Sequence, residues 1–236
     1  MPLGPDAAAE GNSTTMQLAL FDLDHTLLSG DSDILWCEFL IDQGLLDVEF
    51  RERCDAVAER YAAGTVSAPE FCQFFTGLLS GYTPATVQPL RERFLADIVL
   101  PRIPADARAL LARHRAAGDT LVLTTATNRV ISELTAANLG VDSYLCTEVE
   151  CIAGRFTGRT AGVLNMGTGK VDRLRHWLTE QGLSLNLLRS ATFYSDSIND
   201  LALLSVVGRP VVVDPDPRLE STALRKGWAV VRFRRH

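Results

Sequence analysis

Short runs of apolar and β-branched residues recur along the chain and predict strands. Three of them are almost continuously apolar, which is typical of strands in a sheet that is covered on both faces. We expect strands at QLALF (17–21), TLVLTT (120–125), SYLCTEV (143–149), SATFYS (190–195), PVVVD (210–214) and WAVVRF (228–233).

Segments with the apolar spacing of helices lie between these runs. They cover 128–140, 169–182 and 198–208, and each ends in a glycine, the residue type that commonly follows a helix. Because strands and helices alternate in this way, the chain is expected to form an α/β fold around a doubly wound parallel sheet.

The interval 31–100 interrupts this alternation. It contains four segments with helical spacing and no convincing strand pattern. We therefore expect a helical domain over 31–100, inserted into a catalytic core made of 16–30 and 101–236. Residues 1–15 are rich in small residues and lack periodicity, which is typical of a flexible leader.

Turn and cap signals support this division. Ser67 with Glu70 has the spacing of a capping box, and Thr83 followed by Pro84 fits the start of a helix. Turn-forming pairs within 148–162 predict a hairpin that projects from the core.

Composition narrows the class of protein. The 236 residues are 47% hydrophobic and 22% charged, as in globular domains. No window approaches 18 apolar residues, so no membrane partner is expected, and a net charge of −6 argues against nucleic acid. The five cysteines form no CxxC pair, and the start shows no signal-peptide pattern, which together indicate a cytoplasmic protein with reduced thiols. The basic positions Arg232, Arg234 and Arg235 are expected to form a solvated tail.

Polar side chains follow the predicted strands, at the place where open parallel sheets bind ligands. Those after the first, second and fourth strands are Asp22 and Asp24, then Thr125 and Ala126, and then Asp196, Asn199 and Asp200. A lysine, Lys170, lies at the start of the helix before the fourth strand, where the helix dipole disfavours a cation. Only two of the 23 basic residues are lysines, so a specific role is favoured over a merely exposed one.

This combination suits phosphate chemistry. A pair of aspartates after a strand is also common in solvated turns, but three acidic positions at one sheet edge require a cation. Asp22 and Asp196 with a backbone carbonyl suit Mg²⁺, a hard ion with oxygen ligands. Mg²⁺ and Lys170 would attract a phosphate, which Thr125 and the N–H groups of its turn would hold. One carboxylate could then attack phosphorus while the other transfers a proton.

In these motifs the chain resembles the haloacid dehalogenase-like (HAD) superfamily. FDLDHT matches the DxDx[TV] motif, LTTAT the second motif, Lys170 the third and YSDSIND the acidic fourth motif, in order from 17 to 200. The resemblance implies a Rossmann-like three-layer α/β/α core, with the helical insertion over 31–100 as a C1 cap that closes over the site.

The resemblance also implies a role for each matching residue. Asp22 would be the nucleophile and a Mg²⁺ ligand, Asp24 the general acid/base that also offers its carbonyl to the metal, and Asp196 the remaining ligand. Thr125 would hold the phosphate and Lys170 would stabilise its charge. Asn199 and Ala126 would lie beside the phosphate, and Asp200 would orient Lys170 or a metal-bound water.

Placement of the cap makes the chain similar to the phosphoserine-phosphatase-like subfamily IB, especially to members that resemble phosphoserine or histidinol-phosphate phosphatases. Thr125-Ala126-Thr127 replaces the SGG of phosphoserine phosphatases, which leaves the phosphate site intact and the substrate open.

Four further residues are candidate substrate contacts. Asp31 lies nine positions after Asp22, where phosphoserine phosphatases carry an acidic residue that contacts the substrate ammonium group. Asp33, Asn128 and Arg129 are expected near the same mouth from their positions after the first and second strands. For the two aspartates, a helix cap and first-turn acid is the alternative interpretation.

We therefore expect a Mg²⁺-dependent phosphomonoester hydrolase that acts on a small phosphate ester, such as phosphoserine or histidinol phosphate, through an aspartyl-phosphate. A phosphotransferase or phosphomutase of the same fold is the main alternative. A catalytically silent binding protein is disfavoured because every required side chain is present. The number of subunits is left open.

Overall fold

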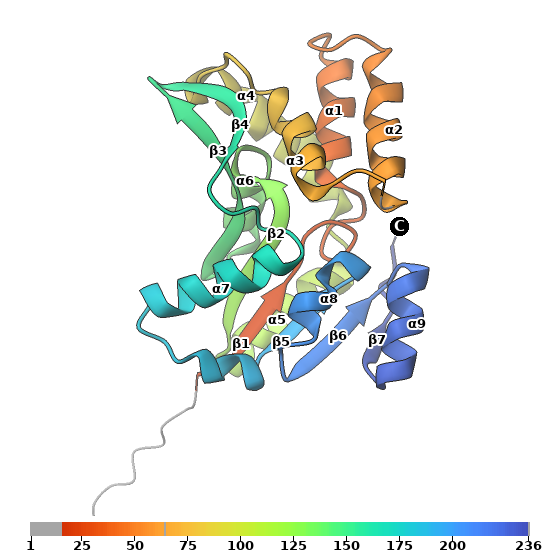
Figure 1. The fold of residues 1–236 in the computed structure, drawn as a ribbon, viewed down its shortest axis with the longest axis vertical. Helices are drawn as coiled ribbons and strands as arrows, with labels where there is room; N and C mark the ends of the chain where they lie inside the picture. The colour runs from red at the N-terminus through yellow and green to blue at the C-terminus, as the bar shows by residue number, and fades with distance from the viewer. Residues whose placement is uncertain (1–15, 64, 236) are drawn as a thin grey trace, which may run out of the picture.

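The computed structural model describes residues 16–63 and 65–235, so the leader expected over 1–15 lies outside the described residues. A seven-stranded sheet forms the centre of the molecule (Figure 1). Its strands are β1 (Leu18–Phe21), β2 (Thr120–Asn128), β3 (Ser143–Ile152), β4 (Arg155–Ala161), β5 (Thr192–Ser195), β6 (Arg209–Val213) and β7 (Ala229–Val231). The spatial order is β4-β3-β2-β1-β5-β6-β7, and the neighbouring strands are parallel except for the β3–β4 pair.

Helices cover both faces of this sheet. Successive side chains of β1 point to opposite faces, and each face has a hydrophobic cluster that buries them under helices. Ala19 and Phe21 belong to the cluster on the side of α5 (Ala105–Ala117) and α6 (Arg129–Leu139). Leu18 and Leu20 belong to the opposite cluster, which is formed with α7 (Thr168–Glu180), α8 (Leu201–Leu204) and α9 (Pro217–Lys226). The result is the three-layer α/β/α core predicted from the sequence.

Four α-helices lie in the described part of 31–100, where the helical insertion is expected. They are α1 (Ser32–Asp42), α2 (Phe50–Ala62), α3 (Ala68–Gly77) and α4 (Pro84–Phe94), and they gather at the end of the sheet toward which β1 points (Figure 1). Both predicted caps are confirmed: Ser67 and Glu70 form a capping box at α3, and Thr83 caps α4 just before Pro84. We refer to α1–α4 as the cap helices.

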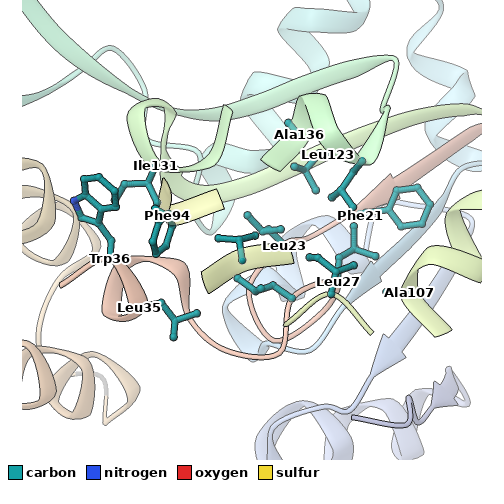
Figure 2. Close-up of a cluster of buried hydrophobic side chains, with 14 of the residues drawn as sticks. Phe21, Leu23, Leu27, Leu35, Trp36, Phe94, Ala107, Leu123, Ile131 and Ala136 are labelled. Carbon is teal, nitrogen blue, oxygen red and sulfur yellow. The ribbon is translucent and has the colours of Figure 1, made fainter. Parts of the chain in front are cut away.

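A continuous hydrophobic cluster joins the cap helices to the core (Figure 2). Phe21 of β1 lies at one end of the view, and Trp36 of α1 and Phe94 of α4 lie at the other. Leu23 and Leu27, from the turn that follows β1, fill the middle and are fully buried. The turn after β1 is therefore packed between the sheet and the cap helices.

The predicted hairpin is also present, as β3 and β4, and it is bonded to the end of α3. Phe156 exchanges two backbone hydrogen bonds with the loop after α3: it accepts from Gly81 N and donates to Tyr82 O, both at 2.9 Å. Gln73 of α3 adds a bond to the carbonyl of Gly158 at 2.7 Å. The hairpin thus attaches one side of the cap helices to the core.

Several boundaries differ from the sequence prediction. The helix expected over 198–208 is only a 3₁₀ turn followed by the short α8, and Gly208 does not take the left-handed conformation of a helix-ending glycine. Gly140, after α6, does adopt it, with φ 65°. Helices α5 and α9 were not anticipated. Among the described residues, no helix is long and apolar enough to cross a membrane.

Candidate active site

The predicted motif residues meet because β2, β1 and β5 are neighbours in the sheet and end at the same edge. Asp22 and Asp24 follow β1, Asp196 follows β5, and Thr125 lies near the end of β2. A cavity of about 120 Å³ opens at this edge. Its lining includes Asp22, Asp24, Asp31, Asp33, Ala126, Thr127, Lys170, Asp196, Asn199 and Asp200.

Lys170 lies between two carboxylates in the first turn of α7. Its Nζ donates to Asp22 Oδ1 at 2.7 Å and to Asp200 Oδ2 at 2.8 Å, and its side chain is only 3% exposed. Burial alone would lower the pKa of Lys170, but the two carboxylates more than offset this and raise it. Lys170 is therefore held as a cation against Asp22.

The position of Lys170 depends on the close approach of the preceding residue to a neighbouring loop. A Cβ on Gly169 would lie 2.1 Å from the carbonyl oxygen of Leu164, so only glycine fits there without movement of the backbone. The short sequence GTGK thus brings the start of α7 close enough for its lysine to reach the site.

Asp22 is the most enclosed of the acidic residues after β1. It is 6% exposed, and its backbone N–H donates to Tyr194 O of β5 at 2.9 Å. Burial raises the pKa of its carboxyl to about 7; the positive charge of Lys170 opposes the shift, and Asp200 and Asp24 add to it. A cation beside its second oxygen would remove this penalty.

Asp24 is oriented by hydrogen bonds to both of its carboxylate oxygens. Ser32 N donates to Oδ1 at 2.7 Å, and the Thr127 hydroxyl donates to Oδ2 at 2.6 Å. The Thr125 hydroxyl is more distant, at 3.5 Å from Oδ2, and accepts from Thr127 N at 3.1 Å. Thr125 is fully buried behind Thr127, which itself faces the cavity.

Thr26 connects the two carboxylates expected to bind a metal. Its hydroxyl lies 3.1 Å from Asp196 Oδ1 and 3.5 Å from Asp22 Oδ2, and it also accepts from Asp196 N at 3.0 Å. The pKa of Asp196 lies well above its usual range because the carboxyl is buried and faces Asp22 and Asp200. The two carboxylates thus converge on one point and repel each other.

This donor set fits Mg²⁺. No group of three His, Cys, Asp or Glu side chains within 16–63 and 65–235 is arranged to hold a metal unaided. Mg²⁺ commonly takes one or two carboxylates and completes its shell with carbonyl oxygens and waters. Asp22, Asp196 and the carbonyl of Asp24 are therefore sufficient protein ligands.

The other residues of the fourth motif take different places. Asp200 is buried, bonded to Lys170 and accepts from the Ser195 hydroxyl at 2.8 Å. Asn199 is exposed at the cavity wall. Tyr61, a residue of α2, lines the same cavity, so a cap helix and the core both contribute to the mouth of the site.

Asp31 and Asp33 both line the cavity, at the start of α1. Asp31 is the N-cap of that helix: its Oδ1 accepts from Asp33 N at 2.9 Å and from Ile34 N at 3.1 Å. Burial and the charge of Asp24 raise the pKa of Asp31 to about 7, and burial with the charges of Asp31 and Asp24 raises that of Asp33. The cap role and the cavity role therefore coexist in Asp31.

Asn128 and Arg129, the other two candidate substrate contacts, do not line the cavities at this edge. Asn128 is buried and caps α6, where its Oδ1 accepts from Ile131 N. Arg129 is turned toward the hairpin and forms ion pairs with Glu148 and Glu133. Asn128 reaches the site only through Asp33, since its Nδ2 donates to the Oδ1 of that cavity-lining residue at 3.5 Å, and Arg129 does not reach it.

A second cavity, of about 880 Å³, opens beside the first, between α1, α2 and the loops after β5 and β6. His25, Asp31, Tyr61, Phe71, Ser197 and Asn199 line both. The ionisable side chains on its wall, apart from the histidine and tyrosine already named, are Asp31, Glu38, Asp55, Glu59, Asp216 and Arg218. Acidic groups thus outnumber basic ones at the cap side of the site.

The sequence analysis gave no role to Thr26, Thr127, Ser32 or Ser195, all of which bond to the aspartates. Thr26 stands in the DxDx[TV] motif and Thr127 in the second motif, so a role for both could have been predicted from the sequence. Ser195 stands in the fourth motif, YSDSIND, and could have been found in the same way, whereas Ser32 carries no comparable signal.

Comparisons with known proteins agree with this geometry. The family model of haloacid dehalogenase-like hydrolases matches residues 19–205. A histidinol-phosphatase of Neisseria meningitidis is 36% identical over 219 residues, which cover 92% of this chain and 99% of the relative. A phosphoserine phosphatase of Mycobacterium tuberculosis is 32% identical over 254 residues, with 99% of this chain and 77% of the relative covered.

Solved structures extend the comparison. A protein of unknown function from Bordetella pertussis superposes with a TM-score of 0.87 at 40% identity, over 92% of this chain and 99% of that one. A phosphoserine phosphatase with a phospho-aspartyl intermediate analogue superposes with a TM-score of 0.68 at 15% identity, over 93% and 94% of the two chains. The second similarity concerns the fold alone.

Proposed function

The chain belongs to the haloacid dehalogenase-like hydrolase family and is a phosphatase, and from this premise we propose that it is a Mg²⁺-dependent enzyme that hydrolyses a small phosphate monoester through an aspartyl-phosphate on Asp22. The observation that carries the proposal is the arrangement of Asp22. One of its oxygens is bound by Lys170 at 2.7 Å, and the other faces Thr26, beside Asp196.

Asp22 and Asp24 divide the chemistry between them. A carboxylate oxygen of Asp22 forms a bond to phosphorus as the bond between phosphorus and the ester oxygen breaks. Asp24 donates its proton to that departing oxygen, and it later takes a proton from the water that cleaves the aspartyl-phosphate. The bonds from Ser32 N and Thr127 hold the Asp24 carboxyl in one orientation for both transfers.

The charges around the cavity support phosphate binding. Mg²⁺, held by Asp22, Asp196 and the carbonyl of Asp24, would supply the positive charge that attracts the phosphate and offsets the repulsion between the carboxylates. Lys170 is held as a cation by Asp22 and Asp200, so it neutralises charge on the nucleophile and on the phosphate oxygens.

The second cavity supports an amine-bearing leaving group. The ionisable lining of this cavity includes one arginine, Arg218, and five carboxylates, at Asp31, Glu38, Asp55, Glu59 and Asp216. An ammonium or imidazolium group is attracted to such a wall, whereas a carboxylate is repelled by it. The wall therefore favours a phosphorylated amino alcohol such as histidinol phosphate over phosphoserine, which carries a carboxylate of its own.

A panel of phosphate esters with Mg²⁺ tests the function. We expect turnover of histidinol phosphate to exceed that of phosphoserine and of glycerol phosphate, which lacks an amine. Asp22→Asn should abolish turnover, whereas Asp47→Asn, at an exposed position of the cap, should not change it. Absence of turnover for every ester with folded wild-type protein would overturn the proposal.

The phosphotransferase alternative has a separate signature. With an added alcohol acceptor, a hydrolase releases inorganic phosphate at the rate at which the leaving alcohol appears. Phosphate release that falls well below alcohol release, with the difference recovered on the acceptor, would assign transfer in place of hydrolysis.

A further inference from the structure

Of the basic residues after β7, Arg232 and Arg234 are exposed, as expected of a solvated tail, whereas Arg235 is not. The chain runs from β7 back toward the end of the sheet where the cap helices lie (Figure 1). Arg232 pairs with Glu220, and Arg234 makes three hydrogen bonds to Asp106. Arg235 differs from both, because its side chain is only 23% exposed and reaches the turn that follows the nucleophile.

The guanidinium group of Arg235 is satisfied by five partners at once. Its Nε donates to Asp214 Oδ2 at 2.7 Å. One terminal nitrogen donates to Leu28 O at 3.1 Å and Ser29 Oγ at 3.2 Å, and the other donates to the carbonyls of His25 and Thr26. The planar guanidinium can serve such a set, whereas an ammonium group cannot span it.

The turn that receives these bonds is strained and has few other ways to satisfy its carbonyls. His25 has a positive φ of 54°, a conformation that residues other than glycine rarely adopt. The N–H groups of Thr26, Leu27 and Leu28 all point back to the carbonyl of Leu23. The helix that follows, α1, begins only at Ser32, and the carbonyls of His25, Thr26 and Leu28 are bonded by Arg235, which takes the part of a cap.

The opposite side of the turn is fixed by burial. Leu23 and Leu27 are both fully buried in the hydrophobic cluster that joins the core to the cap helices (Figure 2). The turn is therefore held between an apolar contact on one side and Arg235 on the other. Release of one side would leave the polar backbone of this segment without its partner.

The same turn carries groups that act at the site. Asp24 precedes His25, and the Thr26 hydroxyl bonds to Asp196 at 3.1 Å. The loop after β6 strengthens the connection, because Asp214 binds Arg235 while Asp216 N donates to the carbonyl of Asp196 at 2.8 Å. One short loop thus contacts both the arginine and the fourth motif.

We propose that Arg235 is a positioning residue, which holds the turn 23–29 in the conformation that presents Asp24 and Thr26 to the cavity. Its effect on turnover rests on the proposed phosphatase function, but its effect on the turn does not. The closing experiment therefore measures both the turn and the reaction.

The first measurement is hydrogen–deuterium exchange of intact protein. In Arg235→Ala, the amides of the turn 23–29 should exchange at least about tenfold faster than in wild type, because their opening is no longer opposed by the guanidinium. Arg234→Ala is the matched control: it removes the two side-chain hydrogen bonds of a neighbouring arginine that does not touch the turn. We expect no change there.

The second measurement separates positioning from folding. With histidinol phosphate, kcat of Arg235→Ala should fall about ten- to a hundredfold with little change in KM, and the Mg²⁺ concentration for half-maximal binding, measured by calorimetry, should rise severalfold. Millimolar guanidinium chloride should restore part of kcat, whereas ammonium chloride should not. Arg235→Lys should give a kcat and a Mg²⁺ affinity between those of wild type and Arg235→Ala. If the alanine variant does not fold, the same measurements are made on Arg235→Lys.

The outcomes separate the two proposals. Unchanged exchange of 23–29, or an unchanged kcat in a folded variant of an active enzyme, would overturn the role of Arg235. If wild-type protein hydrolyses no ester, the phosphatase proposal fails by itself, and the exchange and Mg²⁺ measurements still decide whether Arg235 positions the turn.

Discussion

Replacement of Asp31 by asparagine should make the protein more stable while it weakens substrate binding. Asp31 caps α1 through bonds from Asp33 N and Ile34 N, and an asparagine oxygen can accept both. The substitution removes a negative charge that the folded protein disfavours. Burial and the charge of Asp24 raise the pKa of the Asp31 carboxyl from 3.8 to about 7.

The sign and size of the effect follow from proton linkage. A raised pKa means that the folded state holds the proton more tightly than the unfolded state, so the stability penalty of Asp31 begins near pH 4 and is complete above pH 7. A pKa that moves from 3.8 to about 7 corresponds to at most ~4 kcal/mol, and partial exposure of the side chain reduces it. We expect Asp31→Asn to raise the free energy of unfolding by about 2 to 4 kcal/mol at pH 8 and by about 1 kcal/mol at pH 5.

Urea unfolding at pH 5, 6.5 and 8 in the presence of EDTA measures these values, with the exposed Asp47→Asn as the control for loss of an acidic side chain. In the same variant, KM for an amine-bearing ester should rise about ten- to a hundredfold, as expected for a lost charged contact. A variant that is less stable than wild type at pH 8, or a gain that does not depend on pH, would refute the burial of this charge as its cause.

Three further substitutions address the rest of the site. Lys170→Met should lower the free energy of unfolding at neutral pH by roughly 3 kcal/mol, measured by urea unfolding, because two buried carboxylates lose their common cation; equal stability would contradict the pairing. Gly169→Ala should cost about 2 kcal/mol or more and lower kcat, since its Cβ would meet a carbonyl oxygen at 2.1 Å, whereas Gly77→Ala, with open space around the added carbon, should be neutral. Thr26→Val should weaken Mg²⁺ binding about tenfold in calorimetry through loss of its bonds to Asp196, and an unaltered affinity would exclude that role.

Much of the fold follows from local patterns. The apolar runs of β2, β5 and β6 are nearly continuous because strands at the centre of a covered sheet have no polar face. The caps at Ser67 and Thr83 depend only on residues within one turn. Prediction failed where such a pattern gives no stopping signal: the apolar residues after Asp200 continue to pack beyond Leu204 without forming a helix. Boundaries of this kind are set by packing against other elements.

In the candidate site, too, some residues could be predicted from local patterns and others could not. Asp22, Asp24, Lys170 and Asp196 were predicted together because each follows or opens an element whose end must meet the same sheet edge. Arg129 had the same apparent position at the start of α6, yet the carboxylates of Glu148 and Glu133 draw it away. Chain position locates the backbone, whereas the direction of a long charged side chain depends on the partners that lie near it.

The sequence by itself therefore determined the layers, the inserted helices and the four motifs that meet at one sheet edge, all of which depend on residue type and spacing. Only the tertiary structure decided that the wall of the second cavity is acidic, that the β3–β4 hairpin is bonded to α3, and that Arg235 lies against a turn about two hundred residues earlier in the chain. Such contacts join segments that are distant in sequence, so no periodic pattern of residues predicts them. They form only when the chain brings the two segments together in the fold.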